Sequence, residues 1–83
     1  MTFFYDDSAD VMFIVLAEQV GPCLYIESSG AILRIERATN NLVGVTIPAF
    51  LKSLEGGTLT LPEIATAAMP ESFLSTILGK RPH

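Results

Sequence analysis

The stretch that decides the fold is an unbroken apolar run, Val11-Met12-Phe13-Ile14-Val15-Leu16-Ala17. The run is far shorter than the roughly 20 residues of a membrane-spanning helix, and its β-branched and aromatic side chains favour a strand. Successive side chains of a strand point to opposite faces of a sheet, so residues 11, 13 and 15 share one face and Met12, Ile14 and Leu16 share the other. Both faces are apolar, which predicts a central strand covered on one side by C-terminal helices and on the other by more protein.

Four further segments have the character of strands, at residues 2–5, 23–27, 31–37 and 42–47. Residues 31–37 alternate apolar and charged side chains, which is the two-residue period of a half-buried strand. The segments are separated by turn-forming groups rich in Asp, Ser, Gly, Pro and Asn, at residues 6–10, 21–22, 28–30 and 39–41. Because such short loops favour antiparallel pairing, we predict an antiparallel β-meander of four to five strands.

The pattern becomes helical after Pro48, which cannot donate a hydrogen bond within a sheet. Residues 49–55 suit a short helix closed by two glycines, and the pairs Pro62-Glu63 and Pro70-Glu71 are helix-start signals. We therefore expect two or three short C-terminal helices and an α+β fold. Residues 1–83 form one domain, with a β-meander core at 3–50 and a mostly helical C-terminal extension at 51–83.

The composition predicts an association surface. Of the 83 residues, 49% are hydrophobic and 17% are charged, whereas a chain of this size buries only about 60–65% of its surface. Some apolar side chains must therefore line the surface and mark a partner site, with a homo-oligomer, and a dimer first, as the simplest partner. The candidates are the second face of the central strand and an apolar stripe at helical spacing, which alternatively is core: Met12, Ile14, Leu16, Phe73, Leu74, Ile77 and Leu78.

Other partner classes are disfavoured by charge and segment length. The net charge is −4 with only five Lys and Arg residues, and affinity for a phosphate backbone comes mainly from such cations. Acidic residues stand before the apolar run where a secretory signal would carry basic ones. We expect a cytoplasmic protein that binds neither nucleic acid nor membrane. Cys23 is the only cysteine, so it permits no internal disulfide and no cysteine-based zinc cluster, and no cofactor is expected.

Two parts of the sequence carry a family resemblance: the turn Tyr5-Asp6-Asp7-Ser8-Ala9-Asp10 with the strand that follows it, and the hairpin of residues 30–35 and 42–47. Together, over residues 3–50, they resemble the short bacterial proteins catalogued as domain of unknown function 2283. The resemblance implies the same strand, turn and hairpin order, and it supplies no catalytic residue because that family has no established activity. The chain departs from the family's acidic positions at Asn40, Asn41 and Thr46, and residues 51–83 extend beyond it.

The carboxylates Asp6, Asp7 and Asp10 are the one cluster with chemical potential. They could hold Ca²⁺ or Mg²⁺, or supply a general acid. Alternatively, Asp6 and Asp10 accept backbone N–H bonds within the turn and Asp7 is solvated. We favour the structural interpretation, because the glycine and the bidentate glutamate of a calcium loop are missing.

We therefore predict a non-enzymatic protein-interaction or oligomerisation module with no catalytic residues. Two alternatives stay open. One is a small-ligand or divalent-metal-binding domain that uses the aspartate turn. The other is an antitoxin-like accessory chain, because a small acidic protein can neutralise a basic partner.

Overall fold

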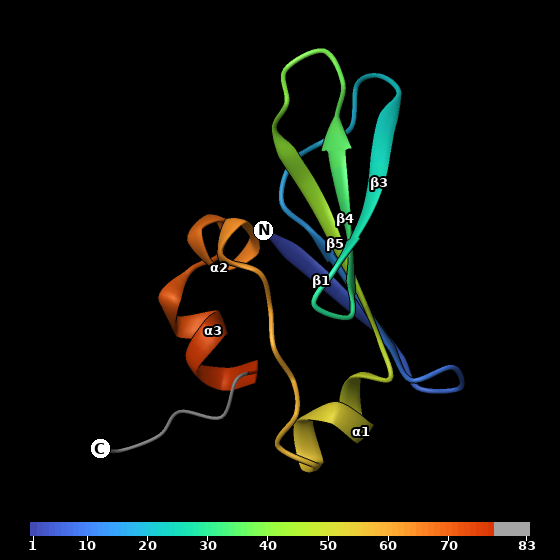
Figure 1. Ribbon diagram of the computed structural model, residues 1–83, viewed down its shortest axis with the longest axis vertical. Helices are drawn as coiled ribbons and strands as arrows, with labels where there is room; N and C mark the ends of the chain where they lie inside the picture. The colour runs from blue at the N-terminus through green and yellow to red at the C-terminus, as the bar shows by residue number, and fades with distance from the viewer. Residues whose placement is uncertain (78–83) are drawn as a thin grey trace.

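The computed structural model of the protein describes residues 1–77 (Figure 1). The side chain of Ile77 and the whole of Leu78, both expected in the helical stripe, lie outside the described part of the chain. Five strands come first, followed by three short helices: β1 (Thr2–Asp6), β2 (Val11–Val15), β3 (Cys23–Ser28), β4 (Ala31–Glu36), β5 (Leu42–Pro48), α1 (Phe50–Glu55), α2 (Glu63–Ala68) and α3 (Glu71–Ile77). The predicted α+β class, with an antiparallel sheet before short C-terminal helices, is confirmed.

The strand order differs from that of a plain meander. All pairs are antiparallel, but the order across the sheet is β1-β2-β5-β4-β3, so β5 and not β3 lies beside β2. The physical reason is burial. The side chains of Val43, Val45 and Ile47 make β5 the most buried strand, and the central position covers both of its edges. The connection from β2 to β3 crosses one end of the sheet, where the N–H of Val20 donates to the buried carboxylate of Glu36.

The tight turns have the residues that the backbone requires. Ser29 and Gly30 form the two-residue loop between β3 and β4, and both have positive φ angles, of 54° and 81°. Asn40 has a φ of 64° before β5. Glycine and asparagine adopt this left-handed conformation at low cost, which is why the sequence marks these positions as turns.

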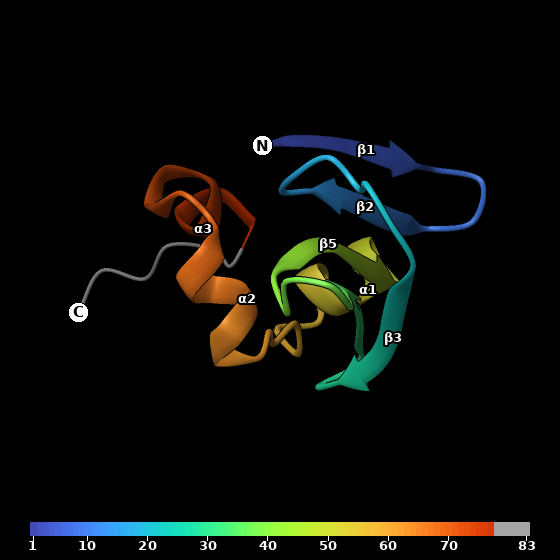
Figure 2. The same cartoon turned by 90° about the horizontal axis from the view of Figure 1, so that it is seen from above.

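The core lies between the sheet and the helices. α1 follows β5 at one end of the sheet, and α2 and α3 return along one side of it (Figures 1 and 2). The buried apolar side chains form one cluster: Met12, Ile14, Ala31, Leu33, Val45, Ile47, Phe50, Ala65 and Met69. None of the helices within residues 1–77 combines the length and apolar character needed to cross a bilayer.

This core corrects part of the predicted association surface. Met12 and Ile14 are buried by the chain's own helices, and Leu16, Phe73 and Leu74 are partly buried against the same cluster. The exposed apolar face of β2 is the opposite one, with Phe13 and Val15. Alternation in the sequence reveals two apolar faces, but it does not indicate which of them the helices cover.

Two matched substitutions test this assignment of faces. Val45 is 2% exposed and Val15 is 40% exposed. We expect Val45→Ala to lower the free energy of unfolding by about 2–3 kcal/mol, through lost burial and a residual cavity, and Val15→Ala to lower it by less than about 1 kcal/mol. Urea unfolding followed by circular dichroism measures both values. Similar losses for the two variants would contradict the assignment.

Candidate functional site

The aspartate turn between β1 and β2 is held by hydrogen bonds from within the chain. A carboxylate oxygen of Asp6 accepts hydrogen bonds from the Ser8 hydroxyl at 2.8 Å and from the Ser8 backbone N–H at 3.1 Å. These hydrogen bonds hold the pKa of Asp6 below its ordinary value, and the bond from the Ser8 hydroxyl has the largest effect. Asp6 therefore closes a local turn of the kind that aspartate side chains form with the backbone two residues on.

Asp10 acts over a much longer distance. Its carboxylate accepts the backbone N–H groups of Leu51 at 2.7 Å and Lys52 at 3.2 Å, and its carbonyl oxygen accepts the N–H of Phe50 at 3.0 Å. These three N–H groups open α1 and have no partners inside the helix. Ala49, the residue before the helix, has a φ of 51° and no side-chain oxygen to cap them. Asp10 therefore caps α1 from another part of the chain.

Tyr5 completes this arrangement. Its hydroxyl donates to the same Asp10 carboxylate at 2.8 Å, and its ring packs at 5.9 Å from that of Phe50. The hydrogen bonds that Asp10 accepts hold its pKa below its ordinary value. The bond from the Leu51 backbone N–H has the largest effect and that from the Tyr5 hydroxyl the second largest. The same hydrogen bond, with burial and neighbouring carboxylates adding to it, raises the pKa of Tyr5 to about 12.

The candidate metal ligands are thus structural in this fold. The carboxylates of Asp6 and Asp10 are engaged by donors of the chain itself, while Asp7 is exposed. Within residues 1–77, no three His, Cys, Asp or Glu side chains gather closely enough to hold a metal ion. The sequence indicated that Asp10 binds backbone N–H groups, but not that these lie 41 and 42 residues away. The one signal in the sequence is that α1 begins without a capping residue of its own.

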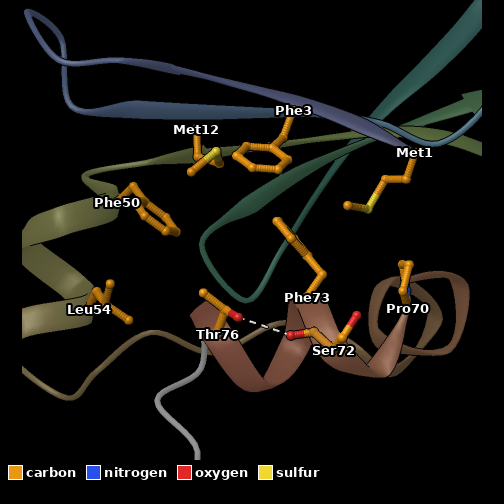
Figure 3. A pocket seen from close by; sticks show the side chains of 9 residues that line it. All are labelled: Met1, Phe3, Met12, Phe50, Leu54, Pro70, Ser72, Phe73 and Thr76. Carbon is orange, nitrogen blue, oxygen red and sulfur yellow. Dashed lines mark hydrogen bonds between the residues drawn. The ribbon is translucent and has the colours of Figure 1, made fainter.

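An apolar groove of about 580 Å³ runs between β1, α1 and α3. Figure 3 shows Phe3 of β1 and Phe73 of α3 pointing toward one another across it, and their ring centroids lie 5.1 Å apart. Among residues 1–77 the groove is lined by no charged side chain, and its lining residues are Met1, Phe3, Met12, Phe50, Leu54, Pro70, Ser72, Phe73 and Thr76. Apart from Met12 and Phe73, these residues were not predicted as a site, because they are scattered along the chain.

The face of the sheet opposite α2 and α3, called here the open face, carries exposed apolar side chains. The strand registers place Phe4, Phe13, Thr46, Ile32 and Glu27 opposite one another in one row across the sheet. The rings of Phe4 and Phe13 stack at 6.2 Å. The large exposed apolar residues of the open face are Phe4, Phe13, Val15, Ile32 and Tyr25.

Arg34 lies across the centre of the open face. A Cβ atom at Gly44 would come within 2.5 Å of the Arg34 guanidinium, so the glycine makes room for this side chain. Within residues 1–77 the Arg34 Nε is buried without a hydrogen-bond partner. The strand registers place Arg34 between Gly44 of β5 and Tyr25 of β3, so a charged side chain stands beside Tyr25 on the open face.

Among the strands of residues 1–77, β1 forms one edge of the sheet and pairs only with β2. Its register runs without a shift from Thr2 opposite Val15 to Asp6 opposite Val11. Natural edge strands are commonly protected by Pro, Lys or a bulge, and β1 has none of these. No strand within the described part of the chain pairs with the outward N–H and C=O groups of β1.

Comparison with protein families, curated proteins and solved structures gave no match for this chain. The resemblance of residues 3–50 to the short bacterial proteins therefore rests on the quoted motifs alone and stays a prediction.

The cap on α1 predicts a specific dependence on pH. The pKa of Asp10 in the folded state lies below its ordinary value of 3.8, so its ionised form stabilises the fold above pH 3.8, and this contribution is lost as the pH falls through the folded-state pKa. We expect Asp10→Asn to lower the thermal midpoint at neutral pH. The difference in thermal midpoint between Asp10→Asn and the wild type should then become smaller below about pH 4.

Thermal unfolding followed by circular dichroism between pH 2 and pH 7 measures this difference. Asp7→Asn, at an exposed position of the same turn, is the matched control and should follow the wild type throughout. A difference between Asp10→Asn and the wild type that stays constant down to pH 2 would contradict the role of the ionised carboxylate.

Proposed function

We propose that this protein is a non-enzymatic protein-interaction and oligomerisation module of the cytoplasm, which associates through β1 and the adjoining open face. One observation carries the proposal. Phe3 and Phe4, neighbours in the edge strand, point to opposite faces of the sheet and are 57% and 64% exposed. A single aromatic residue on a surface is ordinary. Here an unprotected edge strand exposes one aromatic residue on each of its two faces, which favours association.

The charged residues support the same proposal. The carboxylates of Asp6 and Asp10 bind donors of their own turn and of α1. Glu36 is buried and accepts hydrogen bonds from the Val20 N–H and the Thr39 hydroxyl. These three acids therefore have structural partners, and none of them is needed for the association at β1.

Phe3 and Phe4 supply part of the area that such a contact would cover. With roughly 200 Å² for a fully exposed Phe residue, they expose roughly 240 Å² per chain, or roughly 480 Å² in two chains. Stable interfaces bury about 1,200–2,000 Å² in total. A contact centred on these two side chains is therefore expected to be weak, with a population that depends on concentration.

The cytoplasmic location belongs to this proposal, and the single Cys23, which can form no internal disulfide, is compatible with it. An antitoxin-like accessory role stays a prediction from size and charge, and no contact within residues 1–77 favours it.

The proposal predicts that the mass in solution rises with concentration. Light scattering coupled to size-exclusion chromatography should give a mass near the 9.0 kDa of the chain at low micromolar loading, and a mass near twice that value at high loading. The mass should respond little to salt, because the contact is apolar. A mass that stays at 9.0 kDa up to millimolar concentration would contradict self-association.

A further inference from the structure

From the geometry of β1 we infer that the partner is a second copy of this chain, an inference that rests on the proposed function. The two β1 strands pair antiparallel about a two-fold axis that passes beside Phe4, perpendicular to the sheet. This pairing joins two five-stranded sheets into one continuous sheet.

The positions of Phe3 and Phe4 select the edge as the contact. Phe3 lies on the side of the sheet that carries the groove and α3, whereas Phe4 lies on the open face beside Phe13. A partner docked flat on the open face would cover Phe4 and leave Phe3 exposed. A partner strand added alongside β1 places side chains on both faces of the sheet and covers both rings.

The backbone of β1 suits such an addition. Its five residues read Thr-Phe-Phe-Tyr-Asp, four of which are strong strand formers. The regular register with β2 keeps the strand extended, and an extended edge offers alternate N–H and C=O groups to a new strand. The added strand would satisfy these groups in the same way as β2 does on the other edge.

Symmetry selects the register. A two-fold axis perpendicular to the sheet keeps each face on its own side, so residues opposite one another must share a face. Pairing Phe4 with Phe4 of the second copy meets this condition and uses the whole of β1, with Phe3 opposite Tyr5 and Thr2 opposite Asp6. It also creates aromatic pairs across the new boundary on both faces, and such pairs stabilise sheets.

The other edge strand, β3 (Cys23–Ser28), is the competing surface. A two-fold register centred on Tyr25 would pair residues 23–27 of two copies and place Leu24 opposite Ile26. Leu24 and Ile26 are 44% and 43% exposed, less than Phe3 at 57%, and they are aliphatic, so β3 offers fewer aromatic pairs than β1. Tyr25 on β3 is 66% exposed, close to the value for Phe4, which makes it the matched control position.

Charge substitutions at the axis test the inference. In Phe4→Lys and in Phe4→Glu, each residue opposes its own copy, and like charges in direct opposition disfavour pairing. We expect each variant alone to associate about tenfold more weakly than the wild type, or worse. An equimolar mixture should recover the dimer, since Lys then opposes Glu. Tyr25→Lys and Tyr25→Glu should associate as the wild type does, and circular dichroism verifies that every variant folds.

A disulfide provides a second measurement. Residues in direct opposition on antiparallel strands have Cα atoms about 4.5–5.5 Å apart, within the range of about 4.4–6.8 Å that a disulfide spans. With Cys23→Ser as the background, Phe4→Cys should give a covalent dimer under mild oxidation and Tyr25→Cys should not.

The outcomes separate this inference from the proposed function. A wild-type dimer that persists in both Phe4 charge variants, or that is lost in the Tyr25 variants, overturns the β1 pairing and leaves an association module that uses another surface. A wild-type chain that is monomeric at every concentration overturns both.

Discussion

The cap that Asp10 places on α1 is the interaction on which the arrangement of the molecule depends. One carboxylate binds two N–H groups at the start of α1 and the hydroxyl of Tyr5. It thereby ties the β1–β2 turn to the point where the chain leaves β5. A helix of six residues is too short to be stable by itself, so its position depends on this cap and on the burial of Phe50.

Fixing α1 has consequences for the rest of the sheet. The segment after α1 returns along one side, where Ala65 of α2 and Met69 complete the core with Ile14 and Val45. The three short helices lie on one side of the sheet (Figure 2), and within residues 1–77 no helix lies on the open face or along the β1 edge. The apolar composition of the chain is divided between the core and the surface, and the exposed part includes Phe3 and Phe4 of β1 and the apolar side chains of the open face.

Local features of the fold could be predicted from the sequence because local interactions determine them. The strands, the Ser29-Gly30 turn and the helix starts at Pro62 and Pro70 all follow from neighbouring residues. Three features could not be predicted, because each depends on residues that are distant in the sequence. These are the place of β5 between β2 and β4, the choice of which β2 face is covered, and the pairing of Asp10 with α1. The candidate site belongs to this second group, since Phe3 meets Phe73 only in the folded chain.

The central claim is that β1 is the edge through which two copies join, and amide hydrogen exchange followed by NMR at several protein concentrations tests it most directly. The outward N–H groups of β1 should exchange fast in dilute solution and become protected as the concentration rises, while those of β3 should exchange at the same rate throughout. Protection that appears on β3 and not on β1, or β1 amides that exchange fast at every concentration, would contradict the claim.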